Sequence, residues 1–245
     1  AMDATGRIVV FGSYASNLVT GDTNGDADLF RKDLATGTTT RISTASDGSE
    51  ANVESGRFAL SADGRTLAFD SQATNLVAGD TNSLNDVFVK DLVSGVVQRA
   101  SVSTGGAQGN GWTEFPAISA DGRFVAFASQ SANLVTGDSN GGYDVFLRDL
   151  AAQTTTRISV NGLGNETWPE TSFPGLSADG RVAVFRSPSS NYVDGDYNDV
   201  EDAFAKNLTG QEFGGDEAVE AAWLEREPRS RGGRLVLRFD RSLTS

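Results

Sequence analysis

The chain has 245 residues, with 33 Asp and Glu against 20 Lys and Arg, and it contains no histidine and no cysteine. This composition excludes thiol chemistry, zinc fingers and imidazole general bases. The net charge of −13 argues against a nucleic-acid partner, because phosphate binding requires a basic surface, and it favours cations or cationic partners. No apolar run is long enough to span a bilayer, so membrane insertion is not expected.

The first predicted strands follow the Gly6-Arg7 pair, which opens the apolar run IVVF. The run leads into SNLVTGDTN, and then come DLFRKDLATG and TTTRIS. Short segments rich in β-branched and aromatic residues, bounded by Gly, Asn and Asp, are typical of strands joined by turns. The opening of the chain therefore predicts at least three strands.

The same order of segments recurs every 58 residues without insertion or deletion, in units at 6–63, 64–121 and 122–179 and in a partial unit at 180–210. A further apolar segment precedes the Asp-Gly pairs that end at Gly64, Gly122 and Gly180. Asp-Gly between apolar runs predicts a hairpin, because both residues tolerate the positive φ of a type I′ turn. Each unit thus predicts four short antiparallel strands, several of them apolar on both faces.

Radial repetition of four-stranded sheets is the β-propeller solution to exposed sheet edges, so we predict an all-β propeller with these units as blades. A linear array of β-modules is the structural alternative. The combination of S-A-D-G-R-x-x-A-F, N-L-V-x-G-D-x-N and D-V-F-x-x-D-L in every copy resembles the WD40-like (PD40) repeat of TolB-type proteins. The resemblance implies a propeller that is usually secreted or periplasmic and often has no enzymatic activity.

Propellers of this family more often close with more blades than the four seen here. The sequence leaves open a compact four-bladed ring, a part of a larger ring, or a ring shared between chains. The first residues, AMDATGR, align with ALSADGR of the next unit, so the first leading strand is short. The charged segment 211–245 contains GGRLVLRF, which predicts one strand. That strand either closes the ring against the first blade or begins a following domain.

A D-x-N-x-x-x-D loop lies between the second and third predicted strands of every unit. Calcium prefers carboxylate, amide and backbone oxygens, and ligands at these spacings resemble the start of an EF-hand loop. We therefore predict about one calcium ion per repeat. The candidate ligands are Asp22, Asn24, Asp28, Asp80, Asn82, Asp86, Asp138, Asn140, Asp144, Asp196, Asn198 and Asp202. The alternative is a metal-free network of Asx-turns, since Asp and Asn side chains also bind their own backbone.

Other residues of the loops have weaker interpretations. Asp33, Asp91 and Asp149 follow too far along a strand to be ligands, and we predict that they are hairpin-turn residues. The side chains of Asn17, Asn75, Asn133 and Asn191 are further candidate contributors to the metal sites. Trp112, Trp168 and Tyr143 either form an aromatic platform for a sugar or pack beneath the loops.

These patterns favour a non-catalytic, calcium-binding propeller that serves as a binding or structural module of a secreted, periplasmic or cell-surface protein. A protein or a carbohydrate is the expected partner. One alternative is a hydrolase, lyase or lactonase with a central site, against which the lack of histidine and of a unique polar cluster counts. Another is an adhesive module that forms homo-oligomers by strand exchange at open sheet edges.

Overall fold

The computed structural model describes residues 1–161, 163–167, 171–192, 200–209, 222–226 and 235–239. Their regular structure consists of strands, arranged in four antiparallel sheets that follow one another in chain order. The prediction of an all-β fold built from repeated blades is therefore confirmed. Within these residues, no helix is long and apolar enough to cross a membrane.

The second and third sheets are complete four-stranded blades, each with its strands in chain order. Blade 2 contains β4 (Ser55–Leu60), β5 (Thr66–Ser71), β6 (Asp86–Asp91) and β7 (Val97–Arg99). Blade 3 contains β8 (Thr113–Ile118), β9 (Phe124–Ser129), β10 (Asp144–Asp149) and β11 (Thr154–Arg157). The middle strands β5 and β9 are buried over almost their whole length, as expected for sheets that are covered on both faces.

The first and last sheets depart from this plan at the ends of the chain. Blade 1 has β1 (Ile8–Ser13), β2 (Asp28–Asp33) and β3 (Thr39–Arg41), and only the isolated bridge Met2 to Val9 marks the place of a leading strand. Blade 4 has β12 (Ser172–Leu176), β13 (Val182–Ser187) and β14 (Asp202–Asn207), extended by β15 (Ala222–Arg226) and β16 (Leu235–Phe239). The strand predicted in GGRLVLRF is β16, and it pairs with β15.

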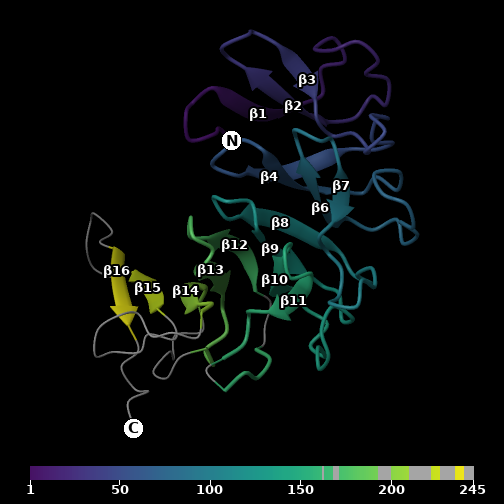
Figure 1. The fold of residues 1–245 in the computed structure, drawn as a ribbon. Coiled ribbons are helices and arrows are strands. Elements are labelled where there is room, and N and C mark those ends of the chain that lie inside the picture. The colour runs from purple at the N-terminus through teal and green to yellow at the C-terminus, as the bar shows by residue number, and fades with distance from the viewer. Residues whose placement is uncertain (162, 168–170, 193–199, 210–221, 227–234, 240–245) are drawn as a thin grey trace.

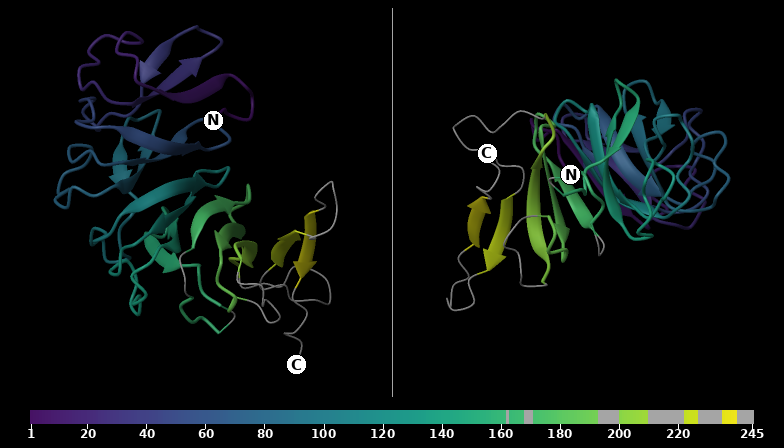
Figure 2. Two further views of the ribbon diagram at one scale, coloured as in Figure 1. Left: turned by 180° about the vertical axis from the view of Figure 1, so that it is seen from behind. Right: turned by 90° about the horizontal axis from the view of Figure 1, so that it is seen from below.

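The four blades stand side by side along an open arc, with the first blade at one end and β15 and β16 at the other (Figures 1 and 2). Strands β4, β8 and β12 lie on the concave side of the arc (Figure 1). Hydrogen bonds link the hairpins of successive blades there, from Ala4 N–H to Ala62 O at 2.8 Å, from Ala62 to Ala120 at 3.0 Å and from Ala120 to Ala178 at 2.9 Å. The blades thus pack radially rather than as a linear array of separate modules.

The core lies between neighbouring sheets. Each blade contributes one phenylalanine from β1, β5, β9 or β13 and one from the strand that follows it, β2, β6, β10 or β14. The centres of the two rings lie 5.7 to 6.0 Å apart in all four blades. These pairs are Phe11 with Phe30, Phe69 with Phe88, Phe127 with Phe146 and Phe185 with Phe204. Buried Lys90 of blade 2 donates to Thr44 O of blade 1 at 2.7 Å, which adds a polar link between sheets.

The hairpins are where the sequence predicted them, but their turn type differs from the prediction. Only the glycine of each Asp-Gly pair has positive φ, for example Gly64 at 70°, whereas a type I′ turn needs two such residues. Asp63 instead accepts hydrogen bonds from Ser61 Oγ at 2.6 Å and from Arg65 N–H at 3.0 Å. The aspartate therefore stabilises the turn through its side chain, and glycine alone adopts the left-handed conformation.

Candidate metal centres

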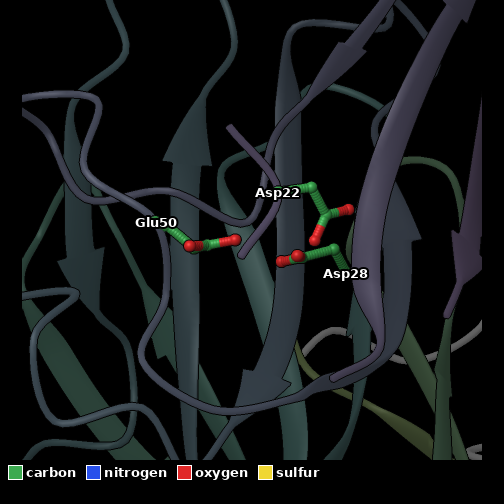
Figure 3. Close-up of side chains that lie close together, drawn as sticks. All are labelled: Asp22, Asp28 and Glu50. Atoms are coloured by element: carbon green, nitrogen blue, oxygen red, sulfur yellow. The ribbon is translucent and has the colours of Figure 1, made fainter. Parts of the chain in front are cut away.

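Three carboxylates meet at one end of blade 1. Asp22 lies in the loop between β1 and β2, Asp28 begins β2, and Glu50 lies in the connection from β3 to β4. One oxygen from each lies within 4.8 Å of the others, and the side chains converge from separate segments (Figure 3). The spacing between Asp22 and Asp28 was visible in the sequence, whereas the third member of this triad was not predicted.

Hydrogen bonds fix two of the three carboxylates. Ser43 donates its hydroxyl to Asp28 Oδ1 at 2.5 Å, and Asp28 is fully buried. The backbone N–H of Thr23 donates to Glu50 Oε1 at 2.9 Å, and the hydroxyl of Thr23 donates to Glu50 Oε2 at 2.6 Å. The loop from Asp22 to Asp28 and the connection after β3 are therefore joined at the site.

Asn24, a candidate ligand, makes hydrogen bonds that close the loop. Its amide oxygen accepts the backbone N–H of Asp26 at 2.9 Å, which makes an Asx-turn, and its amide nitrogen donates to Asp28 Oδ2 at 3.3 Å and to Ala51 O at 3.0 Å. Asn82 and Asn140 accept backbone N–H groups in the same way, from Leu84 and Gly142. The asparagines thus close the loops. Asn24 and Asn140 also donate to Asp28 and Asp144, whereas Asn82 donates to Gly109 O.

Arg41 of β3 supplies the only cation that the structure shows within the described part of this cluster. Its Nη1 forms an ion pair with Glu50 and lies 3.5 Å from Asp28 Oδ2 and 3.7 Å from Asp22 Oδ1. Its Nε is buried without a hydrogen-bond partner, so the guanidinium is not fully matched to the acids around it. Three carboxylates against one arginine leave two uncompensated negative charges if all three ionise.

Blade 3 repeats this arrangement with Asp138, Asp144 and Glu166, whose oxygens again lie within 4.8 Å of one another. Ser159 donates to Asp144 Oδ1 at 2.5 Å, and Ser139 N–H donates to Glu166 Oε1 at 2.8 Å. Arg157 Nη1 lies 2.7 Å from Glu166, and 3.4 Å from both Asp138 and Asp144. Two triads with the same partners therefore stand two repeats apart.

Blade 2 has a glutamine at the position of the third carboxylate. Gln108 Nε2 donates to Asp80 Oδ1 at 3.0 Å and to Asp86 Oδ2 at 3.2 Å. Arg99 lies 3.1 Å from Asp80 and 3.3 Å from Asp86. Two carboxylates against one arginine leave one uncompensated negative charge here if both ionise, compared with two in each triad, so this cluster offers a divalent cation less than the triads do.

The fourth copy of the loop is only partly described. Asp196 and Asn198 lie outside the described residues, and Asp202 is buried at the start of β14. The outer strand of blade 4, β15, pairs with β14 in a register that no longer follows the 58-residue period, since Phe204 pairs with Trp223 whereas Phe146 pairs with Arg157. The residues that follow β15 lie outside the described residues, so the third ligand position of this blade is not described.

The pKa values in the blade 3 triad reflect burial and the charges that lie close together there. Burial raises the pKa of Asp138 to about 6, and the neighbouring charge of Asp144 adds to the shift. Burial also raises the pKa of Asp144, against a hydrogen bond from Ser159 and the charge of Arg157. The pKa of Glu166 is lowered to about 2, because donors from Ser139 and Asn140 and the contact with Arg157 outweigh its burial. One aspartate thus holds its proton until near neutrality.

The donor set suits a hard divalent cation. The triads offer carboxylate oxygens from three segments, and calcium and magnesium take oxygen ligands of this kind. A bound dication would match the two uncompensated charges and remove the proton from the aspartate. The dication would share the carboxylates with Arg41 or Arg157, whose Nε atoms are buried without a hydrogen-bond partner.

Glu50 and Glu166 could have been found in the sequence from the period alone. They stand two repeats apart with Gln108 midway, in register with Arg41, Arg157 and Arg99. They were missed because they lie far from the Asp-x-Asn loop along the chain. Asn75 and Asn133 instead connect successive blades, since Asn75 Nδ2 donates to Glu50 O at 2.7 Å and Asn133 Nδ2 donates to Gln108 O at 2.8 Å.

The hairpin role predicted for Asp33 is confirmed. Asp33 Oδ1 accepts the N–H groups of Ala35 at 2.9 Å and Thr36 at 3.3 Å, and Arg7 binds the same carboxylate from the other side. Asp91 and Asp149 accept turn N–H groups in the same manner. Of the predicted aromatic platform, Trp112 lines a pocket beside β4, Tyr143 is half-buried before β10, and Trp168 lies outside the described residues.

Comparison with known proteins agrees with this architecture. No protein-family model matches the chain, and no curated protein matches its sequence. A putative TolB from Agrobacterium tumefaciens aligns over 84% of this chain and 60% of its own, with 15% identity and a TM-score of 0.53. The chain has a TolB-type β-propeller fold.

The β-propeller domain of the Trilobed protease from Pyrococcus furiosus also aligns, over 96% of this chain and 66% of its own, with 10% identity and a TM-score of 0.53. TolB from Acinetobacter baumannii aligns over 88% of this chain and 47% of its own, with 16% identity and a TM-score of 0.46. The chain thus spans about half to two thirds of the length of these propeller proteins.

Proposed function

We propose that this chain is a non-catalytic binding module in which calcium ions tie together the loops of blades 1 and 3. The observation that carries the proposal is the recurrence of one triad, two aspartates and a glutamate around one arginine, in two blades with the same hydrogen-bond partners. A buried cluster with surplus negative charge opposes folding unless a cation neutralises it. Calcium is abundant outside cells, which accords with a secreted, periplasmic or cell-surface location.

The ligands in this proposal are Asp22, Asp28 and Glu50 in blade 1, and Asp138, Asp144 and Glu166 in blade 3. Asp80 and Asp86 remain a metal-free ion-pair cluster in this proposal, because Gln108 donates an amide hydrogen bond to both of them where each triad has a third carboxylate. For Asp196 and Asp202 we propose no ion of their own, since among the described residues Asp202 is not part of a cluster of three carboxylates. The asparagines shape the loops and are not ligands.

The test uses the substitution that the protein itself carries in blade 2. Changing Glu50→Gln and Glu166→Gln together gives both triads the side chain of Gln108. In the unchanged protein, calcium at a hundredfold excess over Kd stabilises each site by about 2.7 kcal/mol. Two sites would raise Tm by roughly 10 to 20 °C in a chain of this length. We expect calcium to leave the Tm of the double variant unchanged.

Thermal unfolding after chelation, with and without millimolar calcium, gives the readout. Glu54→Gln is the matched control, because Glu54 is an exposed glutamate outside both triads, and it should keep the full calcium response. An equal calcium response in the double variant, or none in the unchanged protein, would show that the triads are ion-pair clusters without metal.

A further inference from the structure

A pocket of about 450 Å³ opens between blades 1, 2 and 3, near the start of β4 and β8. Blade 2 supplies most of its wall, blade 1 adds Tyr14 at the end of β1, and blade 3 adds Trp112 and Glu114. Both β4 and β8 lie on the concave side of the arc (Figure 1). The pocket therefore stands on the face where a propeller presents its central opening.

Asp70 is the buried acid of this pocket, and no other described blade has an acid in its place. The equivalent positions one repeat away are Gly12 and Ala128, and the fourth blade has Arg186. Asp70 is 3% exposed; Arg57 N–H donates to its Oδ1 at 2.8 Å, while its Oδ2 is buried with no hydrogen-bond partner. A buried carboxylate oxygen without a donor is unfavourable, and a ligand that donates a hydrogen bond would satisfy it.

The backbone around Asp70 is adapted to hold it. A Cβ atom on Gly56 would come within 2.5 Å of Asp70 Oδ1, so a larger residue there would displace the carboxylate from its present position. The register of β4 on β5 shifts between Ser55 and Phe58, and the same irregularity recurs in β8, where Phe115 has a φ of 58°. The irregularity occurs again in β12, where Phe173 has a φ of 53°, so it belongs to the first strand of blades 2, 3 and 4 and is not specific to this pocket.

The charge of the pocket is negative. Glu54, Asp70 and Glu114 face a single cation, Arg57, whose Nη1 lies 2.7 Å from Glu114 Oε2 and 3.5 Å from Asp70 Oδ2. The guanidinium also lies 4.0 Å from the centre of the Phe115 ring. The walls thus already bind one guanidinium by carboxylates and an aromatic face, and two negative charges remain when all three acids ionise.

An inorganic dication does not fit this pocket well. Among the described residues, the carboxylates here do not form a cluster close enough to bind one ion, in contrast to the two triads. An organic cation spreads its donors over several ångströms and uses aromatic faces, which Tyr14 and Trp112 provide at the rim. A neutral sugar would use the same aromatic rings but would leave the charge unmatched.

We propose that this pocket binds an organic cation, an ammonium or guanidinium group carried by a basic peptide or by a polyamine. The group donates to Asp70 Oδ2 and lies against Trp112 and Tyr14, while Glu54 and Glu114 balance its charge. This inference gives the proposed binding module a ligand class. It does not depend on the calcium sites, because none of the triad ligands lines the pocket.

Isothermal titration in saturating calcium tests the inference, with spermidine and a lysine- and arginine-containing peptide as separate ligands and an uncharged oligosaccharide as the third. We expect one binding site per chain for a cationic ligand. The ligand that binds more tightly, the peptide or spermidine, shows whether the cationic group belongs to a basic peptide or to a polyamine. Asp70→Asn should weaken binding by about 30-fold or more, as for one member of a buried charge pair. Glu114→Gln is a second variant that weakens the same site without touching the buried carboxylate.

Arg57→Ala should strengthen cation binding, because the external cation then takes the place of the internal guanidinium. Asp47→Asn removes an exposed carboxylate far along the β3 to β4 connection and should leave affinity unchanged. Binding of the oligosaccharide alone, equal loss in Asp70→Asn and Asp47→Asn, or no binding of either cation would overturn the proposal. Loss of one bound calcium in Asp70→Asn would overturn it too, since the pocket would then be a metal site.

Discussion

Blades 1 and 2 share strand order and register, yet their acidic clusters differ by one side chain. Both place two aspartates against an arginine from the third strand, Arg41 or Arg99, but the acid Glu50 of blade 1 is the amide Gln108 in blade 2. When all the acids ionise, the blade 2 cluster keeps one surplus negative charge, whereas the blade 1 cluster keeps two. Positions that repeat in every blade thus build the fold, and positions that break the repeat set the charge of individual sites.

The largest difference in stability between blades 1 and 2 is expected when the arginine of each cluster is replaced. Arg99→Leu leaves Asp80 and Asp86 buried with no cation, and we expect a loss of about 3 to 5 kcal/mol in the free energy of unfolding, with or without calcium. Arg41→Leu should cost a similar amount in chelator but much less in calcium, because the dication replaces the guanidinium. Chemical denaturation in both buffers measures the difference.

The exposed Arg65, at a hairpin of blade 2, offers a control. Arg65→Leu should change stability by less than about 0.5 kcal/mol in both buffers. Equal calcium rescue of Arg41→Leu and Arg99→Leu would contradict the distinction between the two clusters.

Asp70 should make the protein less stable as pH rises. Burial raises its pKa to about 6, so between its ordinary pKa near 4 and about 6 the folded state holds a proton that the unfolded state has released. Stability is therefore lost across this window as pH increases, by roughly 3 kcal/mol for this group. Asp70→Asn should remove that part of the decline and raise the stability at pH 7, although it weakens cation binding.

The measurement is chemical denaturation at intervals from pH 4 to 7 in calcium, which also keeps Asp138 ionised in the proposed metal site. Asp179→Asn, at an exposed turn, is the control. It should leave the decline from pH 4 to 7 in place, because hydrogen bonds from Ser177 and Arg181 lower the pKa of Asp179 and keep it ionised across this range. An unaltered pH profile in Asp70→Asn would mean that this carboxyl ionises normally in the folded state.

A smaller effect is expected from building the missing acid into blade 2. Gln108→Glu removes the amide donor to Asp80 and Asp86 and adds a third negative charge, so in chelator it should cost about 1 to 3 kcal/mol. In calcium the cost should disappear and one additional ion should bind. Thermal unfolding and metal analysis of the same preparation test both parts, and a variant that is destabilised equally in both buffers would show that the triad alone does not make a metal site.

The repeat itself was readable from the sequence because its signals are local and recur every 58 residues: the Asp-Gly hairpins, the paired phenylalanines and the Asp-x-Asn loops. The aspartates of the triads were found for the same reason. Glu50 and Glu166 were not, since they reach the loop only after β3 has folded back on β2. The role of Asn24 also required the structure, because an amide can turn either its oxygen or its nitrogen toward a neighbour.

The pocket was harder to predict. Asp70, Gly56 and Arg57 each occur once, in strands whose other residues follow the repeat, so a search for recurring motifs passes over them. The sequence argument that no unique polar cluster exists failed at this place, because Arg57 and Glu114 lie in different blades and meet only when β4 packs against β8. The open arc likewise depends on how the sheets pack, which no local motif encodes.

The number of calcium ions bound per chain, counted by elemental analysis after dialysis against micromolar calcium, tests the metal sites most directly. We expect two ions in the unchanged protein, one in either Glu50→Gln or Glu166→Gln, and none in the double variant. Four ions in the unchanged protein would assign a site to every Asp-x-Asn loop and contradict the role of the glutamates. No bound calcium at all would contradict the metal sites themselves.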